Sequence, residues 1–225
     1  MNYNLIFDLG YHNGKSTINY LKDGYTIVAV ECNPDLITRV KCIFESYIKD
    51  KQLILVEKAI SDKDHNVIDF FICNYFSEWS SCNYKIPYRE SNDVTKIIVS
   101  TITLSSLIQE YGCPYYCKID IEGYDAIAIK SLSGLPEIPK YISAESECIG
   151  DEDHDSIDFL EVLNSMRDVG YTKFAIVHGS NDEVIDFTRL EYTNYENAAI
   201  TLALLRKNFT FEKEWCFWFD IVATY

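Results

Sequence analysis

The sequence predicts an α/β domain with a mostly parallel sheet that is covered by helices on both faces. Short runs of apolar and β-branched residues alternate with segments of helical periodicity through most of the 225 residues. Such alternation is typical of parallel strands joined by helical crossovers. The hydrophobic content of 48% indicates a folded chain, and no stretch resembles a linker. We therefore expect a single domain over residues 1–225.

The predicted strands are short runs rich in β-branched and aromatic residues. They lie at 5–7, 26–30, 53–56, 67–73, 116–121, 141–144, 171–177 and 214–224. Residues 74–100 are polar and aromatic, and we expect them to be irregular.

The predicted helices show apolar residues at helical spacing, and several have recognisable ends. The helix that begins at Pro34 follows Asn33 as its N-cap and has one apolar face, which extends to Tyr47. Thr103 is expected to cap another helix. The remaining helices are expected at 15–22, 104–111, 126–132, 157–169 and 195–210.

The composition excludes several classes of function. The formal net charge of -15 disfavours binding of nucleic acid through its phosphates. No run approaches the ~20 apolar residues of a membrane span, and no signal peptide precedes the first strand, so we expect a cytoplasmic protein. The eight cysteines form no CxxC pair and are expected to be reduced thiols.

The stretch NLIFDLGYHNGKST, residues 4–17, connects the first strand to the first helix. Gly10 and Gly14 permit close approach of a ligand to the backbone, and the helix start offers unpaired N–H groups. Glu31 ends the second strand, where its carboxylate can accept both hydroxyls of a ribose. These features indicate a site for a nucleoside-containing ligand, and the alternative is a tight turn beside a solvated carboxylate.

A second motif, KIDIEGYD, spans residues 118–125. Lys118, Asp120 and Glu122 alternate along a strand that should be buried on both faces, where an unpaired charge is costly. Asp120 is expected at the carboxyl end of this strand, over the same cleft as Asp8. The alternative is a Lys–Asp pair within the sheet, followed by an acidic helix start.

With these two motifs, the chain resembles the FkbM family of methyltransferases over roughly residues 4–147. The matching segments are FDLGYHNGKST, VAVECNPD, LSSLIQEYGCPYYCKIDIEGYD and YISAESE. The resemblance implies the Rossmann-like class I methyltransferase fold, with a mostly parallel seven-stranded sheet whose last strand is antiparallel. The sequence departs from the family pattern at Ser105 and Asp125, where the family usually has aspartate and glutamate.

The resemblance also implies S-adenosylmethionine as the cofactor. Asp8 would lie near its amino-acid part, and the turn at 59–62 would border its adenine. The residues expected to bind it are Asp8, Gly10, Asn13, Gly14, Thr17, Glu31, Ser61 and Asp120. The loop does not match the G-x-G-x-x-G fingerprint of dinucleotide-binding proteins, which disfavours a nicotinamide-dependent oxidoreductase.

Methyl transfer to a hydroxyl requires a positioned acceptor and a group that takes its proton. The expected catalytic residues are Asp120 first, then Glu122, and also Glu145 near the end of the strand predicted at 141–144. Lys118 would orient a carboxylate. No metal site is expected, although these three acids and Glu147 could ligate a divalent ion.

The expected reaction is therefore O-methylation of a sugar, a glycan precursor or a natural-product metabolite. N-methylation of an amino sugar and a non-catalytic, nucleoside-binding scaffold are the alternatives. Acceptor choice is expected to lie in residues 74–100 and 178–212. The helix within the second of these segments could form a substrate cap or a homodimer contact. His12 is expected to pack within its loop or to be solvated, and the alternative is that it faces the cleft. Trp79–Ser81 could border the substrate or the cofactor.

Overall fold

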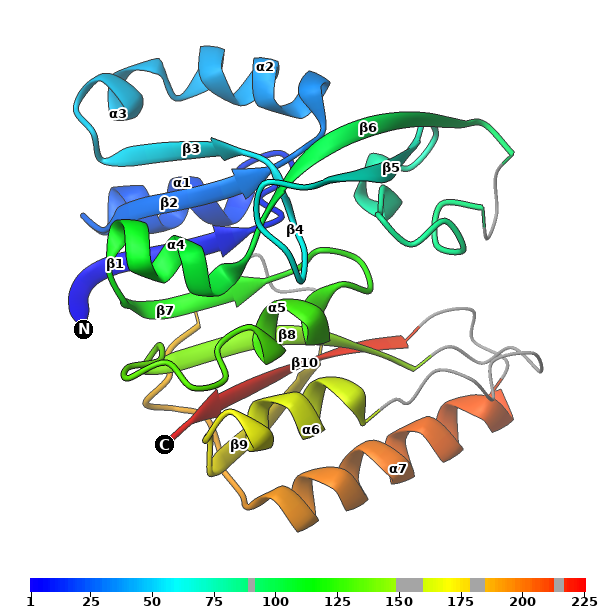
Figure 1. Ribbon diagram of the computed structural model, residues 1–225. Coiled ribbons are helices and arrows are strands. Elements are labelled where there is room, and N and C mark those ends of the chain that lie inside the picture. The colour runs from blue at the N-terminus through cyan, green and yellow to red at the C-terminus, as the bar shows by residue number, and fades with distance from the viewer. Residues whose placement is uncertain (89–91, 149–159, 179–184, 213–216) are drawn as a thin grey trace.

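Figure 1 shows the computed structural model, which describes residues 1–88, 92–148, 160–178, 185–212 and 217–225. Seven strands form the main sheet in the order β3-β2-β1-β7-β8-β10-β9. Their bounds are β1 Asn2–Leu9, β2 Thr26–Glu31, β3 Leu53–Glu57, β7 Pro114–Ile119, β8 Tyr141–Cys148, β9 Lys173–His178 and β10 Phe217–Thr224.

The strands β1, β2, β3, β7 and β8 pair in parallel, whereas β10 pairs antiparallel with both β8 and β9. This confirms the predicted fold class, a seven-stranded, mostly parallel sheet with an antiparallel last strand. The strand order reverses at β1, because β2 and β7 lie on opposite sides of it. Ligands of open α/β sheets bind at the carboxyl ends of the strands beside such a reversal.

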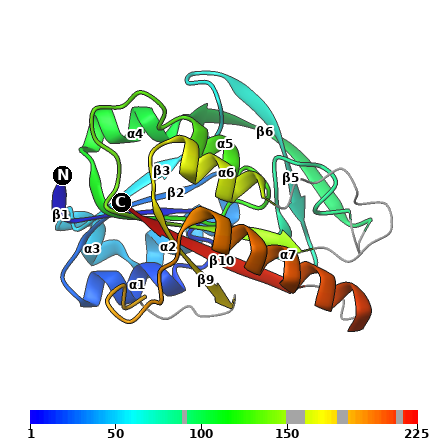
Figure 2. The same cartoon turned by 90° about the horizontal axis from the view of Figure 1, so that it is seen from below.

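Helices cover both faces of this sheet (Figures 1 and 2). Alternate residues of β1 divide between two cores: Ile6 packs in the core with α1 and α2, whereas Phe7 packs in the core with α4, α5, α6 and α7. The helices are α1 Lys15–Lys22, α2 Pro34–Ile43, α3 Glu45–Lys49, α4 Leu104–Tyr111, α5 Asp125–Lys130, α6 Glu161–Asp168 and α7 Tyr195–Glu212.

Several predicted helix ends are confirmed. α1 has the predicted bounds, the Asn33 side chain accepts from the Asp35 N–H at the start of α2, and Thr103 caps α4. The predicted helix up to Tyr47 instead breaks at Phe44, where the backbone leaves the helical region and the ring is buried. The first residues of the predicted helix 157–169 lie outside the described residues.

The expectation that residues 74–100 are irregular is wrong for their last part. Strand β6, Val94–Ile102, pairs antiparallel with β5, Val67–Cys73, and parallel with the short β4, Ala59–Ile60. These three strands form a small second sheet, which Figure 1 shows beside the carboxyl ends of β2 and β3. The sheet brings the segment after β5, including the short 3-10 helix Ser77–Trp79, close to the main sheet.

Among the described residues, no helix combines the length and apolar character that crossing a bilayer requires.

Candidate functional site

A hollow lies at the carboxyl ends of β1, β2 and β7, beside the strand-order reversal. Its wall includes Gly10 and His12 after β1, Glu31 at the end of β2, and Asp120 and Glu122 after β7. The small sheet and the segment after β5 complete it with Ile60, Phe70, Ser77 and Ser80. The two motifs that the sequence analysis singled out therefore meet at one hollow.

Gly10 fixes the geometry of the first motif. Its φ is +80°, and a Cβ at this position would lie 1.8 Å from the carbonyl oxygen of Asp120. The Gly10 N–H donates to the Val30 carbonyl at 2.9 Å, and the Asp120 N–H donates to the Leu9 carbonyl at 3.0 Å. The loop after β1 is thus held between the ends of β2 and β7, in a space that only glycine fits.

Glu31 is held by the backbone that follows it. Its Oε1 accepts from the Cys32 N–H at 2.8 Å and from the Asn33 N–H at 2.9 Å. Burial raises the pKa of the Glu31 carboxyl, and these N–H groups, together with that of His12, act in the opposite direction. The arrangement presents an oriented acceptor group on the wall of the hollow, as a ribose would require.

Asp8 and Thr17 lie behind this wall. Asp8 is fully buried, and its Oδ2 accepts from the Thr17 hydroxyl at 2.5 Å. Burial raises the pKa of Asp8, while Lys118 and the Thr17 hydroxyl act in the opposite direction. Direct contact of Asp8 or Thr17 with a cofactor stays a prediction, and the geometry gives both a supporting position.

The other predicted cofactor residues lie around the loop and the small sheet. Gly14 has a φ of +78° and precedes α1, and a Cβ there would lie 2.5 Å from the Phe44 ring. Asn13 is exposed and accepts from the Lys15 N–H at 3.0 Å. Ser61 is buried, where its hydroxyl donates to Asp62 at 3.1 Å. Their contact with a ligand also stays a prediction.

The segment after β5 forms hydrogen bonds with both motifs, and the sequence did not predict these partners. His12 Nε2 and the Ser77 hydroxyl lie 2.8 Å apart in a hydrogen bond. The buried Ser81 hydroxyl donates to the Glu122 carbonyl at 2.6 Å and accepts from the Asn83 N–H at 2.8 Å. For the contact of Ser81 with Glu122, the paired serines after Trp79 were the signal in the sequence.

Glu122 adopts an uncommon backbone conformation for a residue with a side chain. Its φ is +51°, and that of the following Gly123 is +85°. A Cβ at Gly123 would lie 2.8 Å from a methyl group of Ile86. The Gly123 N–H donates to the Asp125 carboxylate at 3.2 Å. Strained backbone of this kind persists where the surroundings fix it, often at functional sites.

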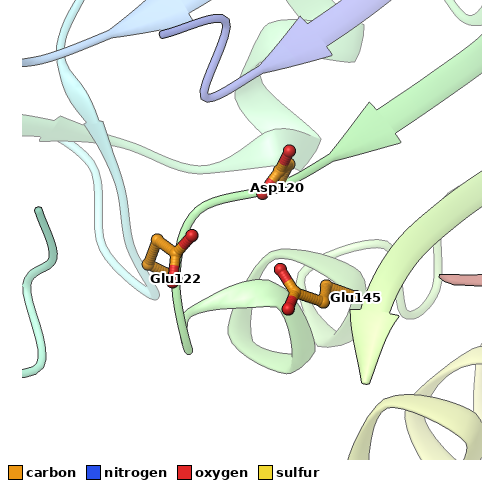
Figure 3. A group of neighbouring side chains, drawn as sticks. All are labelled: Asp120, Glu122 and Glu145. Carbon is orange, nitrogen blue, oxygen red and sulfur yellow. The ribbon is translucent and has the colours of Figure 1, made fainter. Parts of the chain in front are cut away.

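The three predicted catalytic carboxylates converge. Figure 3 shows Asp120 and Glu122 on the loop after β7, with Glu145 of β8 pointing toward them. One oxygen from each lies within 4.8 Å of the others. Such groups are suited to accept a proton or to hold a cation, and the geometry alone identifies no metal. The side chains of Glu147 and His178 lie outside the described part of the chain.

Lys118 orients one of these carboxylates. Its ammonium donates to Asp120 Oδ2 at 2.6 Å, with 22% of the lysine side chain and 41% of the aspartate side chain exposed. Asp120 can therefore meet a substrate, whereas Lys118 is largely enclosed behind it. A role of Lys118 in orienting Asp120 for a reaction stays a prediction.

Gly10→Ala is expected to destabilise the fold by about 2 to 5 kcal/mol, because the new methyl group would overlap the Asp120 carbonyl in a left-handed conformation. Gly24→Ala is the matched control, since Gly24 has a φ of +89° but no atom within 4 Å of a Cβ. Its expected cost is only about 1 to 2 kcal/mol. Urea unfolding measures both, and equal losses would contradict the close contact.

Ser81→Ala is expected to cost about 1 to 3 kcal/mol, because the Glu122 carbonyl and the Asn83 N–H each lose a buried partner. The same substitution at Ser100, which is exposed on β6, serves as the control. Urea unfolding of the two variants checks the difference. If they were equally stable, the hydrogen bonds of Ser81 would not anchor the loop.

Comparisons with solved structures return proteins of low sequence identity. A precorrin-6y C5,15-methyltransferase from Geobacter metallireducens is 11% identical, covers 99% of this chain and 80% of its own, and has a TM-score of 0.43. A SAM-dependent methyltransferase from Archaeoglobus fulgidus is 12% identical, with coverages of 100% and 87% and a TM-score of 0.46.

A phosphoethanolamine N-methyltransferase from Haemonchus contortus, solved with S-adenosylhomocysteine, is 12% identical, with coverages of 100% and 37% and a TM-score of 0.44. No curated protein matches the sequence significantly. A family model described as the methyltransferase FkbM domain matches residues 8–173, which include both motifs. The chain therefore belongs to the FkbM methyltransferase family.

Proposed function

We propose that this chain is an S-adenosylmethionine-dependent O-methyltransferase, acting on a hydroxyl of a sugar, a glycan precursor or a natural-product metabolite. The observation that carries the proposal is the oriented Glu31 carboxylate on the same hollow as Gly10 and Asp120. One side of this hollow suits a ribose, and the other side carries converging carboxylates.

The residues present fit this cofactor. Glu31 would accept the ribose hydroxyls, and the apolar side chains of Leu36, Ile60 and Phe70 offer a surface for adenine. The amino-acid end would face the loop at Gly10, where the backbone can be approached closely. Acidic groups near that end suit a ligand that carries positive charge.

When bound, the cofactor supplies a methyl group activated by a positively charged sulfur. The chain then has to place the acceptor hydroxyl and remove its proton. Asp120 is the first candidate for the proton acceptor, since it is accessible and Lys118 fixes one of its oxygens. Glu122 and Glu145 lie close enough to hold the hydroxyl or to take its proton instead.

Calorimetric titration with S-adenosylhomocysteine tests this proposal, with NAD as the control ligand. We expect micromolar binding of S-adenosylhomocysteine, about -8 kcal/mol, because Glu31 and the Gly10 loop provide the ribose and amino-acid contacts. NAD is expected not to bind. Binding of NAD alone would overturn the proposal, as would the absence of binding by either ligand.

Glu31→Ala is expected to weaken S-adenosylhomocysteine binding about 10- to 150-fold, the effect of losing hydrogen bonds to a charged group. Glu57→Ala is the matched control, because Glu57 is the cross-strand neighbour of Glu31 on β3 but forms an exposed ion pair with Lys41. Calorimetry compares the two variants. Unaltered affinity in Glu31→Ala would count against the site.

A further inference from the structure

A second hollow lies on the face of the main sheet that α1 covers. It is lined by side chains of β1, α1 and β7 and by the segment 185–188, and its volume is about 190 Å³. Among the described residues, it shares no lining residue with the hollow at Glu31 and Asp120. Protein interiors keep few voids larger than a water molecule, and a cavity of about 150 Å³ already holds benzene. This second hollow is therefore large enough for a small organic ligand.

Five aromatic side chains line this second hollow, and we call it the aromatic cavity: Tyr20, Tyr25, Tyr115, Tyr116 and Phe187. The Tyr116 ring meets the Tyr20 ring at 79°, with centroids 6.0 Å apart. It meets the Phe187 ring at 66°, with centroids 4.8 Å apart. Rings at such steep angles cover one another only in part, and the faces of aromatic rings carry partial negative charge. The cavity is thus bordered by apolar surface that also attracts positive charge.

These rings are held in place by contacts outside the cavity. The Tyr116 hydroxyl shares a buried hydrogen bond of 2.6 Å with the Ser143 hydroxyl. Phe187 stacks on Tyr141 at 8°, with centroids 4.2 Å apart. Tyr20 and Tyr116 are almost fully buried. A wall that is ordered before a ligand arrives lowers the entropy cost of binding.

A carboxylate lies at the edge of the aromatic cavity. Asp186 lines it with 49% of its side chain exposed, and its Oδ1 accepts from the Thr188 hydroxyl at 2.6 Å and from the Thr188 N–H at 3.1 Å. These hydrogen bonds lower the pKa of Asp186, so the carboxylate is charged at neutral pH. Its Oδ2 faces Arg189 at 3.0 Å, but the arginine side chain is 85% exposed, and such ion pairs are weak. Within the described part of the chain, no lysine, arginine or histidine lines the cavity.

We propose that the aromatic cavity binds a small organic cation, an ammonium group that carries methyl or other alkyl substituents. The alkyl groups suit the rings and the buried Ile6, and the positive charge is attracted by the ring faces and by Asp186. An anionic ligand is disfavoured, because the formal net charge of the chain is -15 and the cavity offers it no cationic partner. The inference goes beyond the proposed function and does not depend on it.

Proton NMR titration of the full chain with choline tests the proposal, with ionic strength held constant by sodium chloride. The control ligand is the neutral carbon isostere of choline, in which a tert-butyl group replaces the trimethylammonium group. We expect choline to bind about 5- to 30-fold more tightly than this isostere, the range of a cation on aromatic faces. Its methyl protons should show nuclear Overhauser effects to the rings of Tyr25 and Phe187. Equal affinities, or no saturable binding of choline at millimolar concentrations, would overturn the proposal.

Two variants separate the contributions of ring and charge. Tyr25→Leu removes one ring face but keeps apolar bulk, so choline should bind about 5-fold more weakly while the isostere is unaffected. Tyr84→Leu is its control, because Tyr84 is 57% exposed and lies outside the cavity. Asp186→Asn should weaken choline binding about 2- to 5-fold. Because Asp186 is exposed, this variant decides the matter even if Tyr25→Leu does not fold, and unaltered choline affinity in it would contradict the proposal.

A third variant locates the bound cation. Glu31→Ala changes the first hollow and none of the residues that line the aromatic cavity. Choline affinity should therefore be the same in this variant as in the unmodified chain. A loss of choline binding in Glu31→Ala would place the cation in the first hollow and overturn the inference, whatever the outcome for S-adenosylhomocysteine.

Discussion

The contact between Gly10 and the backbone of Asp120 is the constraint on which the rest of the site depends. It joins the loop after β1 to the loop after β7 with no side chain between them. The hydrogen bonds of these loops to Val30 and Leu9 complete the junction. Because the strand order reverses at β1, this junction also places Glu31 and Asp120 on a common hollow. Under the proposed function, the groups for cofactor binding and for proton transfer are therefore held by one junction between two loops.

Charge is the second organising feature of the site. Lys118 lies opposite Asp8 of β1, and it donates directly to Asp120 on the loop after β7. The hydrogen bond from this enclosed lysine fixes the orientation of the Asp120 carboxylate on the loop after β7. Under the proposed function, this excess of negative charge favours binding of a cationic ligand and uptake of the proton of the acceptor.

Local signals were sufficient for the main fold. Asn33 and Thr103 mark helix starts, and β-branched runs mark the strands of the sheet. The small second sheet was missed because β6 pairs with β5 over a long, polar connection, a tertiary contact without a local signature. The position of Asp220 beside Glu145 likewise has no local signature, because only the antiparallel pairing of β10 with β8 brings the two residues together. The hydrogen bond between His12 and Ser77 likewise depends on the path of the chain between β5 and β6.

The most direct test of the account is a crystal structure of the chain with S-adenosylhomocysteine. We expect the ribose hydroxyls on the Glu31 carboxylate, the adenine against Ile60 and Phe70, and the sulfur facing Asp120. A ligand bound elsewhere on the molecule, or a hollow that stays without ligand at a saturating concentration, would contradict it.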